Sequence, residues 1–330
     1  MPEVRTFLRE LFVTAVAAAH PNSCLASRLP APPQNGRLMV LAAGKAAGSM
    51  TVAAERHYLD TLRIEPGRMM GFAVARHGYG RPTRVVTMVE AGHPIPDAAG
   101  VAAAERTLEL AGQAGRDDLV LVLLSGGASA NWIAPAQGIS LEDKRAVTHA
   151  LLLSGATIGE INVVRKHLSR IKGGRLAVQA QPARVVTLAI SDVPGDSPTV
   201  IGSGPTVGDP STLEEARAIT EKYRLELPQS VARALFDLRN ETPKPNDPAF
   251  ANTEFHLIAR PRDAFEAAEN AVRAGGFACV RLGEHLEGDA EVRAIEHARL
   301  ARDLQAQGRR AVILSGGELT VAVRGKGRGG

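Results

Sequence analysis

A lysine stands on a glycine-rich turn that follows a short apolar run. The segment "AAGKAAG" (42–48) places Gly44 and Lys45 where a strand would pass into a helix. It is not a Walker A loop, because Met39 and Ala46 break that pattern. A cation near the positive end of a helix dipole is locally unfavourable, which indicates a compensating anion. We therefore favour a phosphate contact over the alternative of a solvated lysine at a helix start.

The tripeptide Ser-Gly-Gly occurs twice, each time directly after an apolar run that is typical of a buried strand. One copy is residues 125–127 in "VLVLLSGGAS", and the other is residues 315–317 in "AVILSGGEL". Glycines carry no Cβ, so their backbone N–H groups can approach an anion closely, although tight turns also use glycine for steric reasons alone. The candidate residues for binding nucleotide or phosphate are Gly44, Ser125, Gly126, Gly127, Ser129, Gly316 and Gly317.

Two further segments offer polar groups for a carboxylate or a phosphate. "EAGHPIPDAAG" (90–100) holds a histidine and an aspartate, although the aspartate could instead cap a helix that begins near Ala98. "INVVRKHLSRIKGGRLA" (161–177) predicts one helix with a broad polar face and an apolar face, ended by two glycines. Its polar face is either solvated or an anion clamp, and we favour the clamp. The candidate substrate-binding residues are His93, Asp97, Asn162, Arg165 and Lys166.

The segment "SDVPGDSPTVIGSGPTVGDPST" (191–212) is a polar loop much longer than an ordinary connection. Asp192 and Asp196 lie near its start, directly after a predicted strand, and Pro194 and Gly195 fix a turn between them. Carboxylates at a strand end, opposite glycine-rich anion sites, suit Mg²⁺ bound beside a nucleotide. Two Asx turns in a surface loop are the alternative. We favour a metal site at these two aspartates.

Alternating strands and helices must position these segments. Capping-box spacing predicts helix starts at Ser140, Thr157 and Ser211. The alternation is typical of an α/β fold: a largely parallel, Rossmann-like sheet with helices on both faces, followed by a second, smaller α/β domain. The polar segments would then gather beyond the carboxyl ends of the strands, where such sheets bind ligands. The predicted strands are 37–44, 85–92, 118–127, 183–192, 254–260, 277–283 and 310–318.

A proline-rich segment predicts the domain boundary. Residues 240–252 hold three prolines and no apolar periodicity, so we expect a linker there between a domain over 1–239 and a second over 253–330. The second ends inside a strand and a glycine-rich turn, and we expect it to be truncated at its carboxyl end. Residues 1–21 predict an amphipathic helix docked on the domain rather than a secretory signal.

Bulk composition narrows the class of ligand. The 330 residues carry a net charge of only +4, with 4% aromatic residues and no basic run, which argues against nucleic-acid binding. No window is long and apolar enough for a membrane span. Cys24 and Cys279 follow no metal-binding spacing, and we expect reduced thiols, as in the cytoplasm. An anionic small molecule is the ligand that fits best.

Taken in order along nearly the whole chain, the motifs resemble those of the bacterial glycerate 2-kinase family. Its members have a glycerate-kinase amino-terminal domain and a MOFRL carboxy-terminal domain, and some carried the older name hydroxypyruvate reductase. The segments that carry the resemblance are "AAGKAAGSM", "EAGHPIPD", "LLSGGASA", "INVVRKHLSRIKGGRLA", "SDVPGDSPTVIGSGPTVGDPST" and "LSGGELTVAVRGKGRGG".

The resemblance implies ATP-dependent phosphorylation of D-glycerate to 2-phosphoglycerate, with Mg²⁺, in a cleft between two domains of a cytoplasmic enzyme. It places Lys45, Asp192 and Arg324 near the transferring phosphoryl group. The chain departs from the family pattern at Ala128, where a third Gly is usual, and at Leu319, where Thr is common. Family members also continue past the final "GRGG".

Two other functions remain as alternatives. An NAD(P)-dependent hydroxypyruvate reductase would need G-x-G-x-x-G opening a helix, and "GSGPTVG" (202–208) has the wrong spacing. The other alternative is a truncated chain that binds nucleotide without turnover. The residues leave open transfer to the 2- or the 3-hydroxyl, a metal-ligand or a base role for Asp192, and a monomer or a homodimer.

Overall fold

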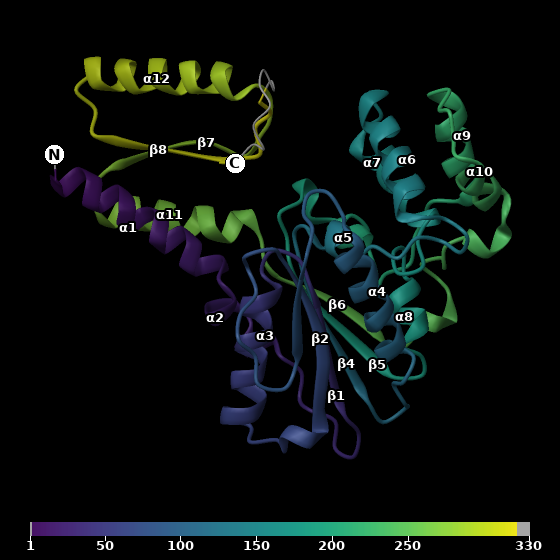
Figure 1. Ribbon diagram of the computed structural model, residues 1–330. Helices are drawn as coiled ribbons and strands as arrows, with labels where there is room; N and C mark the ends of the chain where they lie inside the picture. The colour runs from purple at the N-terminus through teal and green to yellow at the C-terminus, as the bar shows by residue number, and fades with distance from the viewer. Residues whose placement is uncertain (1, 322–330) are drawn as a thin grey trace. The chain divides into compact units, whose positions relative to one another are not determined.

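The computed structural model describes residues 2–321, and the chain divides into two compact units (Figure 1). The larger unit is Cys24–Ile258, and the smaller unit combines residues 1–23 with the residues from 259 onward. This division differs from the predicted linker at 240–252. The physical reason is that strand β6 (Thr253–Ala259) lies next to strand β5 (Arg184–Ile190) in the sheet of the larger unit.

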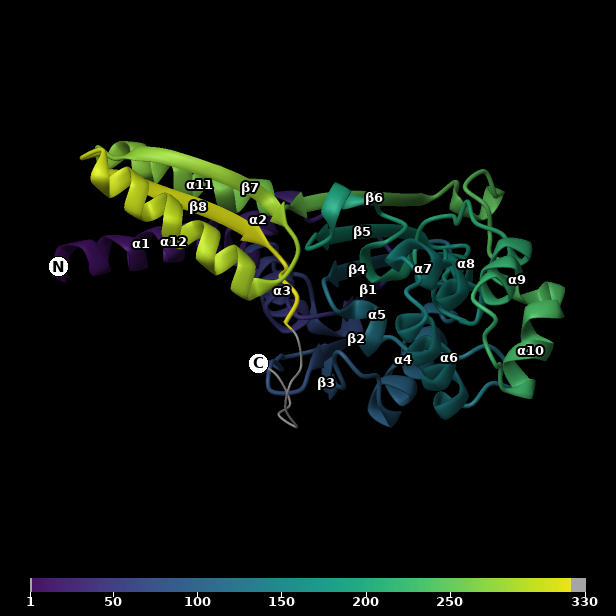
Figure 2. The ribbon, with the colours of Figure 1, turned by 90° about the horizontal axis from the view of Figure 1, so that it is seen from above.

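The larger unit is built on a six-stranded sheet. Its other strands are β1 (Leu38–Ala43), β2 (Met69–Arg76), β3 (Thr87–Ala91) and β4 (Leu119–Ser125). The strand order is β3-β2-β1-β4-β5-β6, as Figure 2 shows from above. The pairs β1–β2, β1–β4, β2–β3 and β4–β5 are all parallel, which confirms the predicted α/β class with a largely parallel sheet.

Strand β2 is the one strand of this sheet that our sequence analysis did not predict. Gly71 interrupts its apolar run, and glycine weakens a strand signal. In the structure Gly71 pairs with Val40 of β1, and a Cβ at Gly71 would lie 2.1 Å from the Val40 carbonyl oxygen. The glycine therefore permits a close approach of the two strands.

The two faces of the sheet are covered by different helices. Residues 39, 41 and 43 of β1 pack with helix α4 (Ala98–Ala111) and with the short helices α5 (Ala128–Asn131) and α8 (Arg175–Gln179). Residues 38, 40 and 42 pack with helix α3 (Ala47–Glu55). Figure 1 shows α3 on one side of the sheet and the other three helices on the opposite side. Both faces are thus buried, which explains why the central strands read as continuous apolar runs.

Four helices at the side of the larger unit form a separate apolar cluster, which includes Val147, Ile161, Ala216 and Val231. The predicted cap at Ser140 and the capping box of Thr157 with Glu160 are confirmed. The predicted start at Ser211 is wrong by one residue, because Thr212 forms the capping box. These helices are α6 (Leu141–Leu153), α7 (Ile158–His167), α9 (Leu213–Lys222) and α10 (Gln229–Phe236).

The helix predicted to run from residue 161 to the two glycines at 173–174 ends earlier than predicted. Helix α7 ends at His167 and α8 begins at Arg175, so Ser169 and Arg170 lie in the segment between them. The N–H groups of Gly173 and Gly174 donate to carbonyl oxygens of Ser203 and Gly204 in the long polar loop, at 3.0 and 2.7 Å. Hydrogen bonds to another loop therefore replace those that would have continued the helix.

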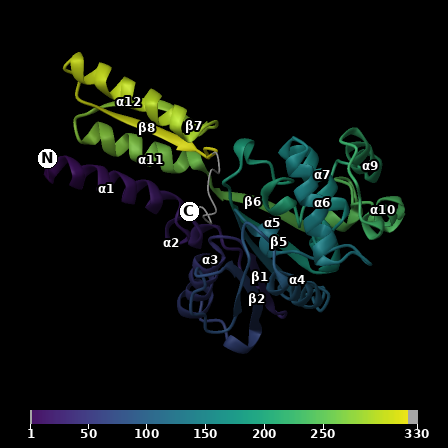
Figure 3. The same ribbon diagram turned by 45° about the horizontal axis from the view of Figure 1, so that its top comes forward.

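The smaller unit combines both ends of the described chain. Strands β7 (Ala278–Leu286) and β8 (Ala311–Gly317) pair in parallel and lie between helices α11 (Pro261–Ala274) and α12 (Ala290–Ala306), as Figure 3 shows. Helix α1 (Pro2–Ala19) runs beside α11, and it is the helix predicted over residues 1–21. Phe7 stacks on Phe277 with ring centroids 4.9 Å apart, and Leu11 is buried with Val272 and Val312.

The remaining helical segments are short. Within residues 2–321, no helix is both long enough and apolar enough to cross a membrane. Helix α2 covers Pro21–Cys24, and a π-helical segment covers Arg56–Thr61. Short 3-10 helices lie at Ala26–Arg28, Pro66–Arg68, Pro194–Asp196, Ile201–Ser203, Leu238–Asn240 and Pro248–Phe250.

Candidate active site

The strand order places a candidate ligand site between β1 and β4. The order runs β1, β2, β3 in one direction and β4, β5, β6 in the other, so it reverses between β1 and β4. Open α/β sheets bind ligands beyond the carboxyl ends of the strands at such a reversal. Gly44 and Lys45 follow β1, residues 126–127 follow β4, and Asp192 follows the adjacent strand β5. Three of the segments singled out in the sequence therefore lie at one edge of the sheet.

Lys45 forms an ion pair with Asp192 at this edge. The Lys45 Nζ lies 3.0 Å from the Asp192 Oδ2, and the two side chains are 43% and 45% exposed. The Lys45 N–H donates to the Gly126 carbonyl oxygen at 2.8 Å, which fastens the turn after β1 to the turn after β4. Exposed ion pairs contribute little to stability, so this pair is free to exchange its partners for those of a ligand.

The turn after β4 has no space for side chains. A Cβ at Gly126 would lie 1.8 Å from the Asp192 Oδ2, and a Cβ at Gly127 would lie 2.8 Å from the His93 ring. Gly127 also has a φ of +84°, in the left-handed region that favours glycine. The backbone of the turn thus lies directly against Asp192, His93 and Lys45, which is the close approach that binding an anion through N–H groups requires.

Helix α5 connects this turn to two other loops. The Ser129 Oγ lies 2.8 Å from the Ser203 Oγ in the long loop. Asn131 is fully buried, and its Nδ2 donates to the carbonyl oxygens of Ala91 and Gly92, just before His93. Sequence reasoning missed both Ser203 and Asn131. For Asn131 the available signal was a single amide in the otherwise apolar run that follows Ser129.

Three cationic side chains lie close together: Lys144, Arg165 and Lys172. The two lysines are 2% and 1% exposed, and burial lowers the pKa of all three groups. The positive charge of Arg165 lowers the pKa of both lysines further. Within residues 2–321, none of the three forms an ion pair with a carboxylate. Both lysines donate to backbone carbonyl oxygens, so Arg165 is the member of this cluster that remains for an anionic ligand.

Two of the predicted substrate-binding residues, Lys166 and Asp97, have partners within the protein. Lys166 forms a buried ion pair with Asp209, 2.5 Å apart, in the second half of the long loop. Asp97 accepts the N–H of Gly100 as the N-cap of α4, which is the alternative that the sequence left open, and it lies 2.8 Å from the His77 Nε2. Although burial acts in the opposite direction, the hydrogen bonds to Gly92, His77 and Gly100 lower the pKa of Asp97. Asn162 is buried within α7.

The two aspartates proposed for Mg²⁺ lie in one loop. Asp196 ends a 3-10 turn four residues beyond Asp192. In the described part of the chain, no group of three or more His, Cys, Asp or Glu side chains could hold a metal by itself. Mg²⁺ commonly takes only one or two carboxylates together with phosphate oxygens. The oxygen donors of Asp192, beside a turn that suits phosphate, and of Asp196 in the same loop fit that kind of site.

The remaining predicted site residues belong to the smaller unit or lie outside the described residues. Gly316 and Gly317 are the last two residues of β8, inside the strand rather than in a turn after it. Arg324 lies outside the described residues. The larger unit by itself therefore brings together Gly44, Lys45, His93, Ser125, Gly126, Gly127 and Asp192.

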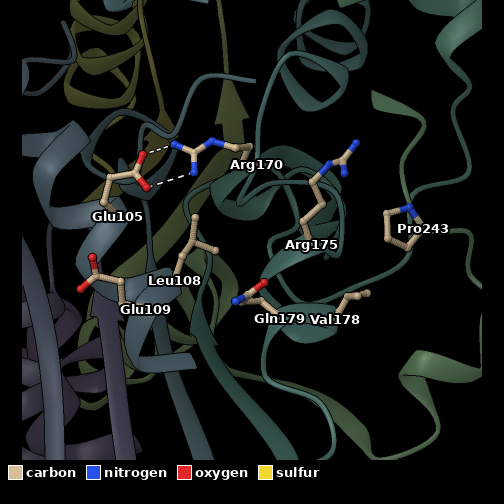
Figure 4. A pocket seen from close by; sticks show the side chains of 8 residues that line it. All are labelled: Glu105, Leu108, Glu109, Arg170, Arg175, Val178, Gln179 and Pro243. Atoms are coloured by element: carbon tan, nitrogen blue, oxygen red, sulfur yellow. Dashed lines mark hydrogen bonds and ion pairs between the residues drawn. The ribbon is translucent and has the colours of Figure 1, made fainter. Parts of the chain in front are cut away.

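A pocket of about 460 Å³ lies elsewhere in the larger unit, between α4 and α8 (Figure 4). Glu105 and Arg170 form an ion pair across it, and Arg175 and Gln179 come from α8. None of the residues that line it belongs to the group around Lys45. The two arginines and two glutamates that line this pocket balance each other in charge, and it lacks the glycine turn that lies beside Lys45.

Residues 7–236 match the family described as a domain of unknown function, DUF4147. A protein of Agrobacterium vitis that carries a hydroxypyruvate reductase name is 45% identical over 99% of this chain and 73% of its own length. The D-glycerate 2-kinase of Thermotoga maritima is 37% identical over 97% of this chain and 75% of its own. The crystal structure of glycerate kinase from Thermotoga maritima superposes with a TM-score of 0.83 and 36% identity, over 100% of this chain and 78% of that one.

Proposed function

The chain belongs to the DUF4147 family. Because a D-glycerate 2-kinase is 37% identical to it over nearly the whole of this chain, we propose that it transfers the γ-phosphoryl group of ATP to the 2-hydroxyl of D-glycerate. The reaction class is phosphoryl transfer to an alcohol, in agreement with its kinase relatives. The observation that carries the proposal is the Lys45–Asp192 pair, which lies against a glycine turn where the strand order reverses.

Lys45 and the turn at residues 126–127 are our proposed phosphate contacts. In phosphoryl transfer the protein contributes mainly positioning and neutralisation of charge on the phosphoryl oxygens. The Lys45 ammonium is half-exposed and next to the turn, so it can leave Asp192 for a phosphate oxygen. The resemblance noted in the sequence adds Arg324 as a second cation, and the MOFRL assignment of residues 253–330 stays a prediction.

Asp192 is our proposed group for the acceptor hydroxyl. The glycerate oxygen forms a bond to the γ-phosphorus while the bond to the leaving ADP oxygen breaks, and the hydroxyl proton passes to a carboxylate. Asp192 is the carboxylate nearest to the turn, and Asp196 lies in the same loop. Both would hold Mg²⁺ when it is bound, and the ion would neutralise charge on the phosphates.

Arg165 is our proposed contact for the glycerate carboxylate. Its guanidinium stays charged under all ordinary conditions, and it has no hydrogen-bond or ion-pair partner within residues 2–321. A guanidinium can bind a carboxylate through two parallel hydrogen bonds, which fixes its orientation. The 2-hydroxyl of glycerate is on the carbon next to the carboxylate, so holding the carboxylate would orient the hydroxyl that reacts.

Phosphorus NMR of the products tests this function directly. The protein is incubated with ATP, Mg²⁺ and D-glycerate, and we expect the signal of 2-phosphoglycerate to grow as ADP forms. The 3-phosphoglycerate signal alone would overturn the position of transfer, and no phosphoglycerate would overturn the activity. Because one relative carries a hydroxypyruvate reductase name, the same sample is tested for NADH oxidation with hydroxypyruvate, and we expect none.

A further inference from the structure

Lys172 is a buried lysine that neither the sequence analysis nor the proposed function uses. Its side chain is 1% exposed, and its Nζ donates to three oxygens: the Ser129 carbonyl at 2.7 Å, the Ser129 Oγ at 3.0 Å and the Trp132 carbonyl at 3.0 Å. An ammonium has three protons, so these acceptors use all of them. They lie within α5 and directly after it, and α5 begins at the glycine turn.

The same segment also holds the long loop. The N–H of Gly173 donates to the Ser203 carbonyl oxygen at 3.0 Å, and the Ser203 Oγ lies 2.8 Å from the Ser129 Oγ. Ser203 is fully buried with a φ of +63°, a backbone conformation that costs about 1 kcal/mol or more for a residue other than glycine. Lys172 and Gly173 thus connect α5 to the loop that carries Asp192.

Stability alone does not account for a lysine at this position. Burial and the charges of Arg165 and Lys144 lower the pKa of Lys172 well below its usual value, and no carboxylate within residues 2–321 forms an ion pair with it. Burying an unpaired cation costs free energy, whereas an apolar side chain of similar length would not carry that cost. A geometric role for its three hydrogen bonds explains why the position holds a lysine.

We propose that Lys172 is a positioning residue for phosphoryl transfer, which holds the turn at residues 126–129 in place against Asp192. This inference rests on the proposed kinase function. The gap at Gly126 is smaller than one methyl group, because a Cβ there would lie 1.8 Å from the Asp192 carboxylate. A shift of α5 by about 1 Å would therefore move the turn relative to Asp192, and such misplacement can lower a rate about a hundredfold.

The chain contains a matched control for this residue. Lys144 is also buried, at 2% exposure, and its Nζ donates to the carbonyl oxygens of Arg165 and Leu168 at 2.8 and 2.9 Å. It therefore shares the residue type, the burial and the kind of acceptor with Lys172, but it contacts the end of α7 instead of α5. Lys172→Met and Lys144→Met remove the same ammonium from two neighbouring places.

Steady-state kinetics with ATP and D-glycerate compare the two variants in the full-length chain. We expect Lys172→Met to lower kcat about tenfold to a hundredfold with a smaller change in KM for ATP, whereas Lys144→Met, which acts through the Arg165 backbone, should mainly raise KM for D-glycerate. Lys172→Arg keeps the donors and should recover part of the loss. Equal kcat values for the two methionine variants, at equal folded fractions by circular dichroism, would overturn the proposal.

Hydrogen exchange supplies a readout that does not depend on turnover. We expect Lys172→Met to raise exchange at residues 126–132 and around Ser203, and Lys144→Met to raise it at residues 165–168 instead. If Lys172→Met does not fold, Ser203→Ala replaces it, because it removes one hydroxyl of the same network. Unchanged exchange at 126–132 in both variants would overturn the positioning role. An inactive wild type with the expected exchange pattern would reject the kinase function alone.

Discussion

The two copies of Ser-Gly-Gly have different structures, although both follow an apolar run. Ser125 is the last residue of β4, and the two glycines after it turn away from the sheet into α5. Residues 315–317 are instead the last three residues of β8, which pairs with β7. The expectation that both copies form a turn after a strand is therefore wrong for the second copy.

The neighbours of the glycines differ as well. A Cβ at Gly126 would meet the Asp192 carboxylate, whereas a Cβ at Gly316 would lie 2.5 Å from the Phe265 ring and one at Gly317 would lie 2.1 Å from the Leu286 carbonyl oxygen. The absence of a Cβ leaves room for the Asp192 carboxylate in the first copy, and for the Phe265 ring and the backbone of β7 in the second. The first copy leads into helix α5, whereas the second copy pairs with β7, and this difference decides what the glycines make room for.

The largest effect should come from the cation beside the first copy. We expect Lys45→Ala to lower kcat by about a hundredfold or more, because it removes a charge from the proposed phosphate site. The midpoint of thermal unfolding should hardly change, since the ion pair with Asp192 is half-exposed. Arg106→Ala, which removes the exposed ion pair with Glu109 on α4, is the control. Similar kcat values for both variants would contradict the assignment.

A methyl group at the first turn should have the next largest effect. Gly126→Ala places a Cβ against the Asp192 carboxylate, so we expect a loss of at least about tenfold in kcat. The free energy of unfolding should change little, because the half-exposed Asp192 side chain can move away. Kinetics and calorimetry on one preparation check both parts, and a variant with full activity would show that the turn tolerates displacement.

The same change in the second copy should affect stability first. Gly317 has a φ of +131°, and a Cβ there would collide with the Leu286 backbone, which cannot rotate away as a side chain can. We expect Gly317→Ala to destabilise the smaller unit by about 2 kcal/mol, with faster hydrogen exchange in β7 and β8. Gly316→Ala meets only the Phe265 ring and should cost less. A larger loss of stability in Gly316→Ala than in Gly317→Ala would contradict this explanation by packing.

The smallest effect should be a response to acid at Glu241, which lies in the same larger unit as the first copy. Glu241 accepts hydrogen bonds from Lys244 and from the Leu213 N–H, and its carboxylate lies 3.3 Å from the His167 Nε2. Burial acts in the opposite direction, but these bonds lower the pKa of Glu241 to about 2. The unfolded chain binds that proton near pH 4.3, so the stabilisation is complete above this pH and is lost as pH falls toward 2.

A glutamine at position 241 checks this response. We expect Glu241→Gln to be less stable than the wild type at pH 7 by no more than about 1 kcal/mol, because the side chain is more than a third exposed. The difference should disappear near pH 2, and thermal unfolding across that range measures it. A constant difference at every pH would show that the carboxylate charge contributes nothing. The smaller unit, where packing holds the Ser-Gly-Gly of residues 315–317, should show no such pH dependence in its hydrogen exchange.

Much of the fold could be predicted from the sequence because the central strands are buried on both faces. Continuous apolar runs such as residues 118–127 gave nearly the observed bounds of β4. The stop at Gly173 and Gly174 was predicted, but the earlier end of α7 at His167 could not be, because the segment after it is held by hydrogen bonds from these glycines to a loop about thirty residues away. The sequence likewise did not indicate that β6 belongs to the six-stranded sheet, because that depends on its pairing with β5 and not on its own residues.

The candidate site was predictable where the chemistry is local. Lys45 and Asp192 each follow a strand, and parallel strands bring their carboxyl ends together, so the sequence indicated a shared edge. Lys172 was missed because its burial and its three acceptors depend on where α5 lies. Lys166 stands six residues earlier in the same motif and was assigned to substrate, whereas its partner Asp209 is known only from the structure.

The pairing of α1 with α11 has a consequence for synthesis on the ribosome. About 240 residues separate the end of α1 from the start of α11. At about 5–20 residues per second, the first helix waits about ten to fifty seconds for its partner. During that interval Phe7 and Leu11 lack the apolar contacts that later cover them, whereas residues 24–258 can already fold behind them. The apolar face of α1 therefore stays exposed during most of translation, and a chaperone that binds apolar segments would act at this stage.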